Sequence, residues 1–361
     1  MQARSLRPGE AGFSLIELMI AVTLGLIVLA ALTTFFVQTS GNRQEMERST
    51  RQIENGRYAI DSLREDVTLA GFYADTSPLV NPEWVLNDVC PADVAAYGFS
   101  IAGGYKAPVP VRGYADGVGV PGCLKDLVAG TDVIAVRRFH TEPLTTAEAA
   151  AAPNNVRFFL QNSQCTEDDP NFPFMTGTGA GPFTLRRVAC AAQLSSVWRL
   201  REQVYYVRNC SVCAPDGPVD DIPTLWRAEL DPADTSTDGD PVMRHSALVE
   251  GIEQLRFEYG IDTTSTAVPG QPDGLPDEWR RCDAATPCDA ATLGNVTAVK
   301  AYILSRTLEP SRDYTDTKTY SMGLAGNVGP FDDKYKRHAY SVLISLPNRS
   351  GAREPQLAVA P

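Results

Sequence analysis

The sequence predicts an α+β protein in which a long N-terminal helix packs on an antiparallel β-sheet head with long, cysteine-bearing loops. Three observations lead to this prediction. The first is an apolar run from Phe13 to Val37 whose only charged residue is Glu17. The second is a charged, proline-free segment, 42–70, with helical spacing of its apolar residues. The third is a set of apolar and alternating runs after Gly71, which predicts strands.

Length, composition and charge exclude several classes of protein. The chain has 361 residues, of which 43% are hydrophobic and 21% are charged, as in an ordinary globular protein. These values argue against a polytopic membrane protein and against a largely disordered chain. The formal net charge of -12 argues against a nucleic-acid partner, which would require a clustered basic surface.

The apolar run is long enough to cross a membrane. About 25 residues at about 1.5 Å per residue span a hydrocarbon core of about 30 Å. Arg4 and Arg7 precede the run, and positive residues there keep the N-terminus in the cytoplasm. A secretory signal peptide would have a shorter apolar region of about 7 to 15 residues. We therefore predict a membrane-spanning helix at 13–38, with a single pass through the membrane and the head on the side opposite the cytoplasm.

Glu17 has two interpretations. A carboxylate within an apolar segment is costly, so such a residue is by default functional and requires a partner. Alternatively, Ser14 followed three residues later by Glu17 matches a capping box, which satisfies free amide groups at a helix start. The local pattern leaves both interpretations open.

The segment Gly12-Phe13-Ser14-Leu15-Ile16-Glu17 resembles the type III signal of type IV pilins and type II secretion pseudopilins. The resemblance implies that a prepilin peptidase removes a leader, 1–12, by cutting between Gly12 and Phe13. The same enzyme would then methylate the new N-terminus at Phe13. Glu17 would become the fifth residue of the mature chain, where this family has its glutamate.

The charges created by such a cleavage suit polymerisation. The free amine of Phe13 would be positive, since an unperturbed α-amino group has a pKa near 8. In a low-dielectric helix bundle, an ammonium paired with a carboxylate is tolerated, whereas either charge alone is strongly penalised. We therefore expect Phe13 and Glu17 to form the subunit assembly site. Glu17 of one subunit would neutralise Phe13 of its neighbour and set the axial offset between them.

The second half of the helix, 39–71, is expected to be amphipathic and to dock on the head. Its apolar residues recur at helical spacing, and charged residues mostly occupy the other face. Gly71 is expected to end the helix. A continuous helix from Phe13 to Ala70 would be about 85 Å long. The apolar stripe comprises Ile53, Ile60, Leu63, Val67 and Ala70.

The head, 72–361, is expected to be β-rich with long insertions. In one strand Leu255, Phe257, Tyr259 and Ile261 alternate on a single face. Proline, glycine and aspartate predict loops at 215–223, 231–241 and 263–277. The expected strands are 132–139, 156–160, 183–189, 202–208, 224–229, 252–260, 298–305 and 338–346.

The head also resembles one branch of the family, the PilW-type minor pilins. The resemblance implies a low-copy subunit that helps to initiate pilus assembly and lies at or near the pilus tip. Its implied partners are other minor pilins, the major pilin, a tip adhesin, the prepilin peptidase and the inner-membrane assembly platform. Twitching motility and cell adhesion would be the associated processes. The matching segments are Arg57-Tyr58-Ala59, Leu63-Arg64-Glu65-Asp66, Ala70-Gly71-Phe72, Gly130-Thr131-Asp132, Phe257-Glu258-Tyr259-Gly260 and 335–340.

Eight cysteines follow the membrane span, and an even number in an exported domain favours disulfides. Cys282 and Cys288 form a natural local pair, and Cys90 with Cys123 would close a long loop. The spacing of Cys210 and Cys213 also allows zinc or redox chemistry. A zinc site, however, needs a second pair of ligands, and the compartment is oxidising. The disulfide candidates are Cys90, Cys123, Cys165, Cys190, Cys210, Cys213, Cys282 and Cys288.

No cofactor or metal is expected, although one acidic segment is a weak calcium candidate. Asp262, Asp273 and Asp277 lie in a loop where members of the branch often have an oxygen-rich, calcium-holding run. Here the expected inner acids are replaced by Thr263 and its neighbours. A solvated turn is the favoured interpretation.

Catalysis has little support in the sequence. The chain has only three histidines, His140, His245 and His338, and lacks the common hydrolase, phosphate-loop and dinucleotide-binding motifs. The sequence therefore predicts a non-enzymatic protein, which the resemblance implies is a minor pilin. The alternatives are a J-type minor pseudopilin of type II secretion and, from another class, a membrane-tethered periplasmic binding protein with an uncleaved helix.

Overall fold

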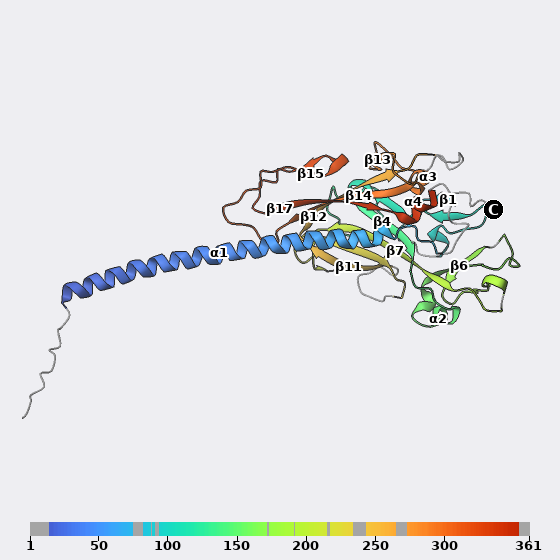
Figure 1. Cartoon of the computed structure of the whole chain (residues 1–361), viewed down its shortest axis with the longest axis horizontal. Helices are drawn as coiled ribbons and strands as arrows, with labels where there is room; N and C mark the ends of the chain where they lie inside the picture. The colour runs from blue at the N-terminus through green and yellow to red at the C-terminus, as the bar shows by residue number, and fades with distance from the viewer. Residues whose placement is uncertain are drawn as a thin grey trace, which may run out of the picture. The chain divides into compact units, whose positions relative to one another are not determined.

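The computed structural model describes residues 14–74, 82–87, 89–90, 94–171, 173–190, 192–214, 217–233, 243–264 and 273–353 (Figure 1). The predicted cleavage residues Gly12 and Phe13 lie outside this part of the chain. Contacts divide the chain into two units, Met1–Thr50 and Arg51–Pro361. The boundary falls inside one helix, so each unit contains part of that helix.

Helix α1 spans Leu15–Thr68. It contains no proline and runs without interruption through Gly25. Beyond its end, Gly71 has a φ of 74°, a left-handed conformation that glycine adopts without strain. The amide of Gly71 donates a hydrogen bond of 2.9 Å to the carbonyl of Arg137, which turns the chain onto the head. The predicted helix stop is therefore confirmed.

The larger sheet of the head has seven strands, all paired antiparallel. Five of them follow the order β11-β10-β7-β4-β3, while β5 pairs with β6 and β7. Strand β4 is buried along its whole length. The strands are β3 (Val111–Tyr114), β4 (Val133–Phe139), β5 (Phe158–Asn162), β6 (Phe174–Thr178), β7 (Val197–Arg208), β10 (Thr224–Leu230) and β11 (Met243–Glu250).

A second antiparallel sheet has the order β13-β12-β14-β17. Its strands are β12 (Ile252–Ile261), β13 (Glu278–Arg280), β14 (Val296–Arg306) and β17 (Arg337–Ser345). Three short pairs complete the strands: β1 (Glu83–Val85) with β2 (Lys106–Pro108), β8 (Cys213–Ala214) with β9 (Gly217–Pro218), and β15 (Tyr320–Ser321) with β16 (Asn327–Val328). The short helices are α2 (Thr146–Ala150), α3 (Ala290–Gly294) and α4 (Pro347–Arg353). Single 3₁₀ turns occur at Val94–Tyr97, Ala115–Gly117, Asn154–Val156, Val188–Cys190 and Gly323–Ala325.

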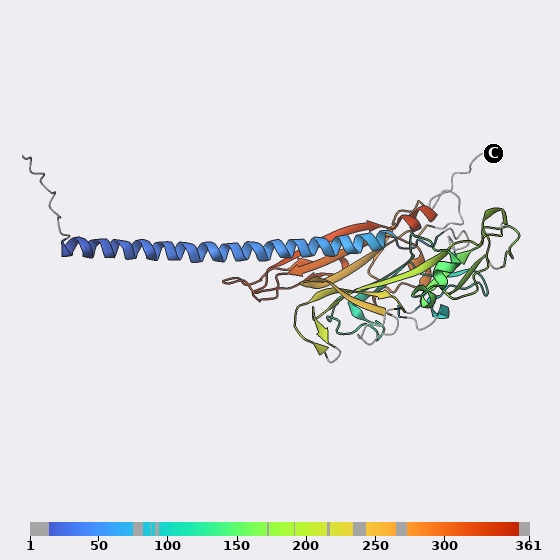
Figure 2. The same cartoon turned by 90° about the horizontal axis from the view of Figure 1, so that it is seen from below.

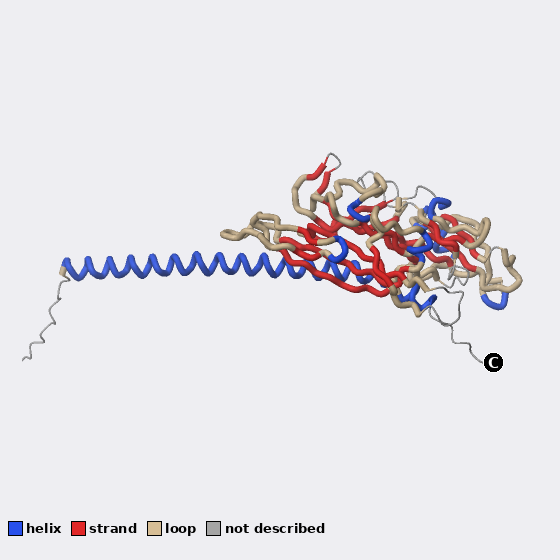
Figure 3. The backbone as a smooth tube through the Cα atoms, turned by 90° about the horizontal axis from the view of Figure 1, so that it is seen from above, coloured by secondary structure: helices blue, strands red, loops and turns tan. Residues whose placement is uncertain are grey.

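The main core of the head joins the last part of α1 to both sheets. Figures 2 and 3 show this part of α1 lying along the strands. Ala59, Leu63 and Val67 of α1 are fully buried in one cluster with Tyr205 of the larger sheet and Ile303 of the smaller sheet. Removing this apolar area from water stabilises the docked helix, and the predicted α+β architecture is confirmed.

Two details of the predicted helix stripe and strands are wrong. The predicted strand 183–189 forms only an isolated bridge at Arg186 and ends in a 3₁₀ turn, because Ala189 and Cys190 have φ of 67° and 55°. On α1, Ile53 is 40% exposed, so it does not belong to the buried stripe. The other predicted strands correspond to β4, β5, β7, β10, β12, β14 and β17.

Candidate assembly helix and its attachment to the head

The start of α1 is capped by its own side chains. Glu17 Oε2 accepts a hydrogen bond of 3.0 Å from the amide of Ser14, and Ser14 Oγ accepts one of 3.2 Å from the amide of Ile16. These contacts satisfy two amide groups at the helix start. The bond to Glu17 is the one that the S-x-x-E pattern predicts, whereas Ser14 Oγ accepts from Ile16 rather than from the amide of Glu17. An ionised carboxylate has two oxygens and about four acceptor positions. Within residues 14–74, Glu17 Oε1 accepts no hydrogen bond, so capping leaves it available to a second donor.

The first unit exposes apolar side chains on every side of the helix. Large apolar residues from Leu15 to Val37 are more than half exposed, and Leu15 reaches 76%. By length and composition, α1 is able to cross a membrane. A helix that is apolar all round is typical of a membrane span or of a packed helix bundle.

In the second unit, α1 is held by close packing against the smaller sheet. Gln52 Nε2 donates hydrogen bonds of 2.9 Å to the carbonyls of Ser305 and Lys336, at the ends of β14 and β17. One turn later Gly56 faces Tyr340 of β17. A Cβ added at Gly56 would come within 2.3 Å of the Tyr340 ring. Glycine is therefore required for this close approach.

A buried ionic contact attaches the end of α1 to the larger sheet. Asp66 Oδ1 accepts a hydrogen bond of 3.1 Å from Arg138 of β4, and Asp66 Oδ2 accepts one from the Tyr205 hydroxyl of β7. The Asp66 and Arg138 side chains are 6% and 5% exposed. Burial, and next the Asp66 charge, raise the pKa of Tyr205, which keeps its hydroxyl protonated as a donor. This contact fixes the helix end over two strands.

The sequence did not predict the contact between Asp66 and Arg138, although it contained a signal. Arg137 and Arg138 lie inside the apolar run DVIAVRRF, and an arginine in a buried strand needs an acidic partner. Arg137 has such a partner in Glu202, at 3.0 Å, with both side chains fully buried. The acidic residue on α1 could not be selected without the register of helix against sheet.

All eight cysteines form disulfides, which confirms the preferred interpretation. The pairs are Cys90–Cys123, Cys165–Cys190, Cys210–Cys213 and Cys282–Cys288. Cys210 and Cys213 therefore carry no thiolate for zinc. The same applies to the two groups in which cysteine sulfurs lie close to carboxylates, Asp126 with Cys210 and Cys213, and Glu167 with Cys165 and Cys190.

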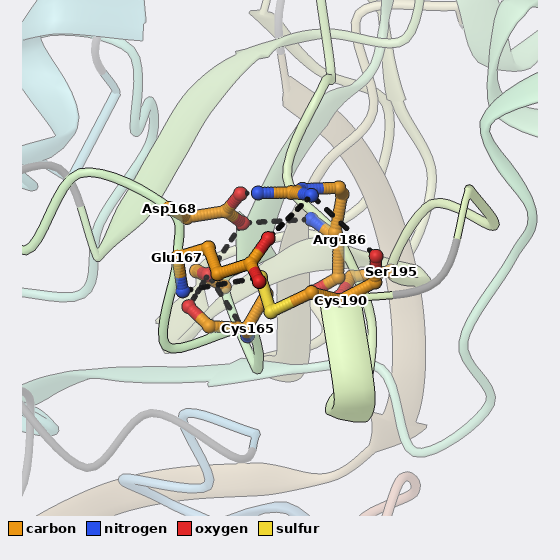
Figure 4. The surroundings of a disulfide bond; sticks show 7 residues. Cys165, Glu167, Asp168, Arg186, Cys190 and Ser195 are labelled. Carbon is orange, nitrogen blue, oxygen red and sulfur yellow. Dashed lines mark hydrogen bonds and ion pairs between the residues drawn. A yellow bond between two sulfur atoms is a disulfide. The ribbon is translucent and has the colours of Figure 1, made fainter.

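The Cys165–Cys190 disulfide joins two loops that also share a charged contact (Figure 4). Asp168 accepts hydrogen bonds of 2.6 Å from Ser163 Oγ, and of 2.9 and 2.8 Å from the amide and Nε of Arg186. The bond from Ser163 and then those from Arg186 lower the pKa of Asp168 to about 2. The carboxylate is therefore ionised at neutral pH and tethers the loops together with the disulfide.

The acidic residues of the calcium candidate are engaged with other groups. Asp262 Oδ2 accepts a hydrogen bond of 2.8 Å from Arg353 Nε. Burial opposes ionisation of Asp262, but the bonds from Arg353 and Thr264 outweigh it and lower its pKa. Asp277 Oδ2 accepts from the amide of Thr263 at 2.8 Å. Asp273 Oδ1 accepts from the amide of Leu275 at 2.9 Å, as in an ordinary turn. A cation at Asp262 would have to displace a guanidinium.

The three histidines lie in separate surroundings. His245 Nδ1 is 2.9 Å from the Tyr206 hydroxyl, and the His338 ring packs edge-on against Tyr340. Burial, followed by the charges of Arg201, Arg199 and Arg138, lowers the pKa of His140.

The described part of the second unit offers edge strands and a groove to other chains. Strands β11 and β3 end the main path of the larger sheet, and β13 and β17 end the smaller sheet. A groove of about 400 Å³ lies between the α1 segment containing Arg51 and Tyr58 and the edge strand β11. Edge strands carry unpaired amide and carbonyl groups and can pair with another chain.

An apolar N-terminal helix continued into a disulfide-bearing, antiparallel head is the arrangement expected of a pilin-like protein. Two family models agree with this class. The model described as type IV pilus-assembly protein W matches residues 204–348, and the prokaryotic N-terminal methylation motif matches residues 7–33. The chain thus resembles type IV pilins and, among them, the PilW-type minor pilins, as the sequence predicted. These matches point to a structural, non-enzymatic role and to membrane anchoring through α1.

The comparison with solved structures returns a type IV-like pilin from Thermus thermophilus. The two chains are 11% identical, the match covers 61% of this chain and 80% of that chain, and the TM-score is 0.23. No curated protein matches the chain.

Proposed function

We propose that this protein is a minor pilin of a type IV pilus that helps to initiate pilus assembly and lies at or near the pilus tip. The observation that carries the proposal is the match of one chain to both the methylation motif, 7–33, and the PilW family, 204–348. Before assembly the protein would be anchored in the inner membrane with its head in the periplasm. After assembly it would be part of the surface fibre.

The assembly site would form in two steps. Cleavage between Gly12 and Phe13 by the prepilin peptidase creates a positive amine, which the same enzyme methylates. Glu17 Oε1 of a neighbouring subunit then accepts a hydrogen bond from that amine, while Oε2 keeps the cap on Ser14. Charge neutralisation in the apolar bundle would fix the offset between adjacent helices. Other minor pilins, the major pilin, a tip adhesin and the assembly platform would be the partners.

Deletion of the chain tests this function against its main alternative. Surface pili and exoprotein release are measured in the deletion strain and in the complemented strain. Loss of pili with normal exoprotein release supports a minor pilin. Loss of secretion with normal pili would instead assign the chain to type II secretion as a minor pseudopilin.

Replacing Glu17 separates its two roles. Glu17→Ala is expected to abolish incorporation into pili, while Ser14→Ala weakens only the cap and should retain incorporation. Immunoblots of sheared pili measure incorporation, and immunoblots of membranes control for expression. If the Glu17→Ala variant is incorporated normally, Glu17 acts only as a helix cap and has no role in assembly.

A further inference from the structure

One face of the larger sheet gathers arginine side chains. Arg138 of β4 lies directly opposite Arg201 of β7, and Glu229 of β10 lies opposite Gln203 of β7. Since side chains two residues apart share a face, Arg227 of β10 joins this group. Arg199 is the next residue on that face of β7, and Arg157 approaches from the loop before β5. We call this surface the arginine face: Arg138, Arg157, Arg199, Arg201 and Arg227.

The arginine face has fewer carboxylates than guanidiniums. In the described part of the chain, three carboxylates form ion pairs with the five arginines of this face. Asp66 is 3.1 Å from one arginine, Asp231 lies 2.8 and 3.7 Å from two, and Glu229 lies 3.7 Å from two. Glu229 is also shared with Arg244, at 3.1 Å. Among the described residues, the arginine face therefore has two more guanidiniums than carboxylates, on a chain whose net charge is -12.

Several buried donors on the same face have no acceptor among the described residues. Gln203 is 1% exposed, and its Nε2 has no hydrogen-bond partner there. The same holds for the Nε atoms of Arg138, Arg201 and Arg227. A buried donor without an acceptor is costly, and native proteins rarely keep several together. The Nε atoms of Arg256, Arg281 and Arg306, elsewhere in the head, also lack an acceptor, and all of these atoms are buried. A ligand would therefore contact the partly exposed guanidiniums of the face rather than these donors.

The shape of the face indicates the kind of ligand. Arginines on three neighbouring strands cover about 10 Å at a strand spacing of about 4.8 Å. This width exceeds what a single phosphate or sulfate can contact. The Arg157, Arg199, Arg201 and Arg227 side chains are 18 to 24% exposed, so a ligand can reach them while they remain partly desolvated. Several carboxylates on one polypeptide fit both the width and the charge.

We propose that the arginine face binds an acidic polypeptide segment of a neighbouring pilus subunit, whose carboxylates pair with the partly exposed guanidiniums of Arg157, Arg199, Arg201 and Arg227. The identification of the partner as a pilus subunit rests on the proposed function. The recognition of an acidic segment does not rest on the proposed function, because it depends only on the charges of the arginine face.

The test measures binding of fluorescent hexaglutamate to the full-length chain in detergent micelles by anisotropy. Wild type is compared with Arg199→Gln/Arg201→Gln, and the matched control is Arg64→Gln/Arg280→Gln. The control removes the same charge from two exposed ion pairs away from the face. Arg201→Lys is a milder variant that keeps the charge but loses the planar fork. Tryptophan fluorescence verifies folding.

The face variant is expected to bind roughly tenfold or more weakly, the control to bind like wild type, and Arg201→Lys to lose a few-fold. If the control variant binds as weakly as the face variant, binding depends only on net charge, and the proposal is overturned. Displacement of the peptide by inorganic sulfate at equal concentration would indicate a small-anion site instead. No binding by wild type would also refute the proposal. So would binding that appears only after Asp234, Asp238 and Asp240 are replaced by Asn, since this chain's own acidic segment would then be the ligand.

Discussion

Asp66→Asn should destabilise the head by removing the charge that compensates Arg138. Both side chains are almost fully buried, at 6% and 5% exposure, and their atoms are 3.1 Å apart. Removing one partner of a buried pair costs about 3 to 5 kcal/mol, because the other charge stays buried without compensation. Asparagine can still accept the Tyr205 hydrogen bond, so we expect the lower limit, about 3 kcal/mol. For a head of about 290 residues, with an unfolding entropy of about 2.1 cal/mol/K per residue, that corresponds to a decrease of about 5 °C in Tm.

Unfolding of the full-length chain in detergent micelles by denaturant measures this loss. All four tryptophans lie beyond residue 72, so their fluorescence reports on the head. The matched control is Asp61→Asn on the same helix. Its partner Arg64 is 3.6 Å away and the two side chains are 69% and 54% exposed, so the loss should be below about 1 kcal/mol. Equal losses in the two variants would refute the argument that the buried contact attaches α1 to the head.

Removing the second charge provides an independent check. Asp66→Asn/Arg138→Gln eliminates the uncompensated guanidinium, so the double variant should lose less than the sum of the two single losses. A coupling of at least about 1 kcal/mol is expected for groups in direct contact. Additive losses would show that the two residues act separately.

Three further predictions concern packing, pH and covalent links. Gly56→Ala should destabilise the head by about 1 to 3 kcal/mol despite the better helix propensity of alanine, because the alanine Cβ collides with Tyr340. Unchanged stability in the same unfolding assay would contradict the close packing of Gly56 against Tyr340. Burial opposes ionisation of Asp220, but hydrogen bonds from neighbouring amides outweigh it and lower its pKa to about 2. The stabilising effect of the Asp220 carboxylate should thus be full above about pH 4 and lost as the pH falls toward 2. The Tm difference between wild type and Asp220→Asn should therefore shrink between about pH 4 and pH 2. A constant Tm difference would contradict this prediction. Cys165→Ser/Cys190→Ser removes a link between residues 25 apart and should cost about 3.5 kcal/mol by loop entropy; a loss below about 1 kcal/mol would show that the loops are held without it.

The sequence predicted the elements whose signals are local. The apolar run after Phe13 and the glycine at position 71 predict most of α1 and its end. Strands such as β12 alternate clearly. Strand β11, Met243–Glu250, was not predicted because it forms an edge and is mostly partly exposed, so its sequence mixes apolar with polar residues. The run 183–189 contains apolar residues, but its last residue, Ala189, and the following Cys190 adopt left-handed conformations, which a strand does not accommodate.

The contacts of the candidate site likewise divide into those with a local sequence signal and those that depend on tertiary packing. The Glu17 cap depends on residues three positions apart and could be predicted from the pattern. The contact of Asp66 with Arg138 joins residues 72 positions apart and depends on how α1 lies on β4 and β7. The Gly56 contact depends on the same register, since nothing near it in the sequence requires glycine. Such contacts arise from tertiary packing, which periodicity does not specify.

The N-terminal mass of the chain recovered from sheared pili tests the central claim most directly. Processing should leave a chain that begins at Phe13, lacks the leader 1–12 and carries a methyl group on its α-amine. This form should be present in the fibres at low abundance relative to the major subunit. A chain that keeps Met1, carries no methyl group and stays in the membrane fraction would contradict the assignment and favour a membrane-tethered binding protein.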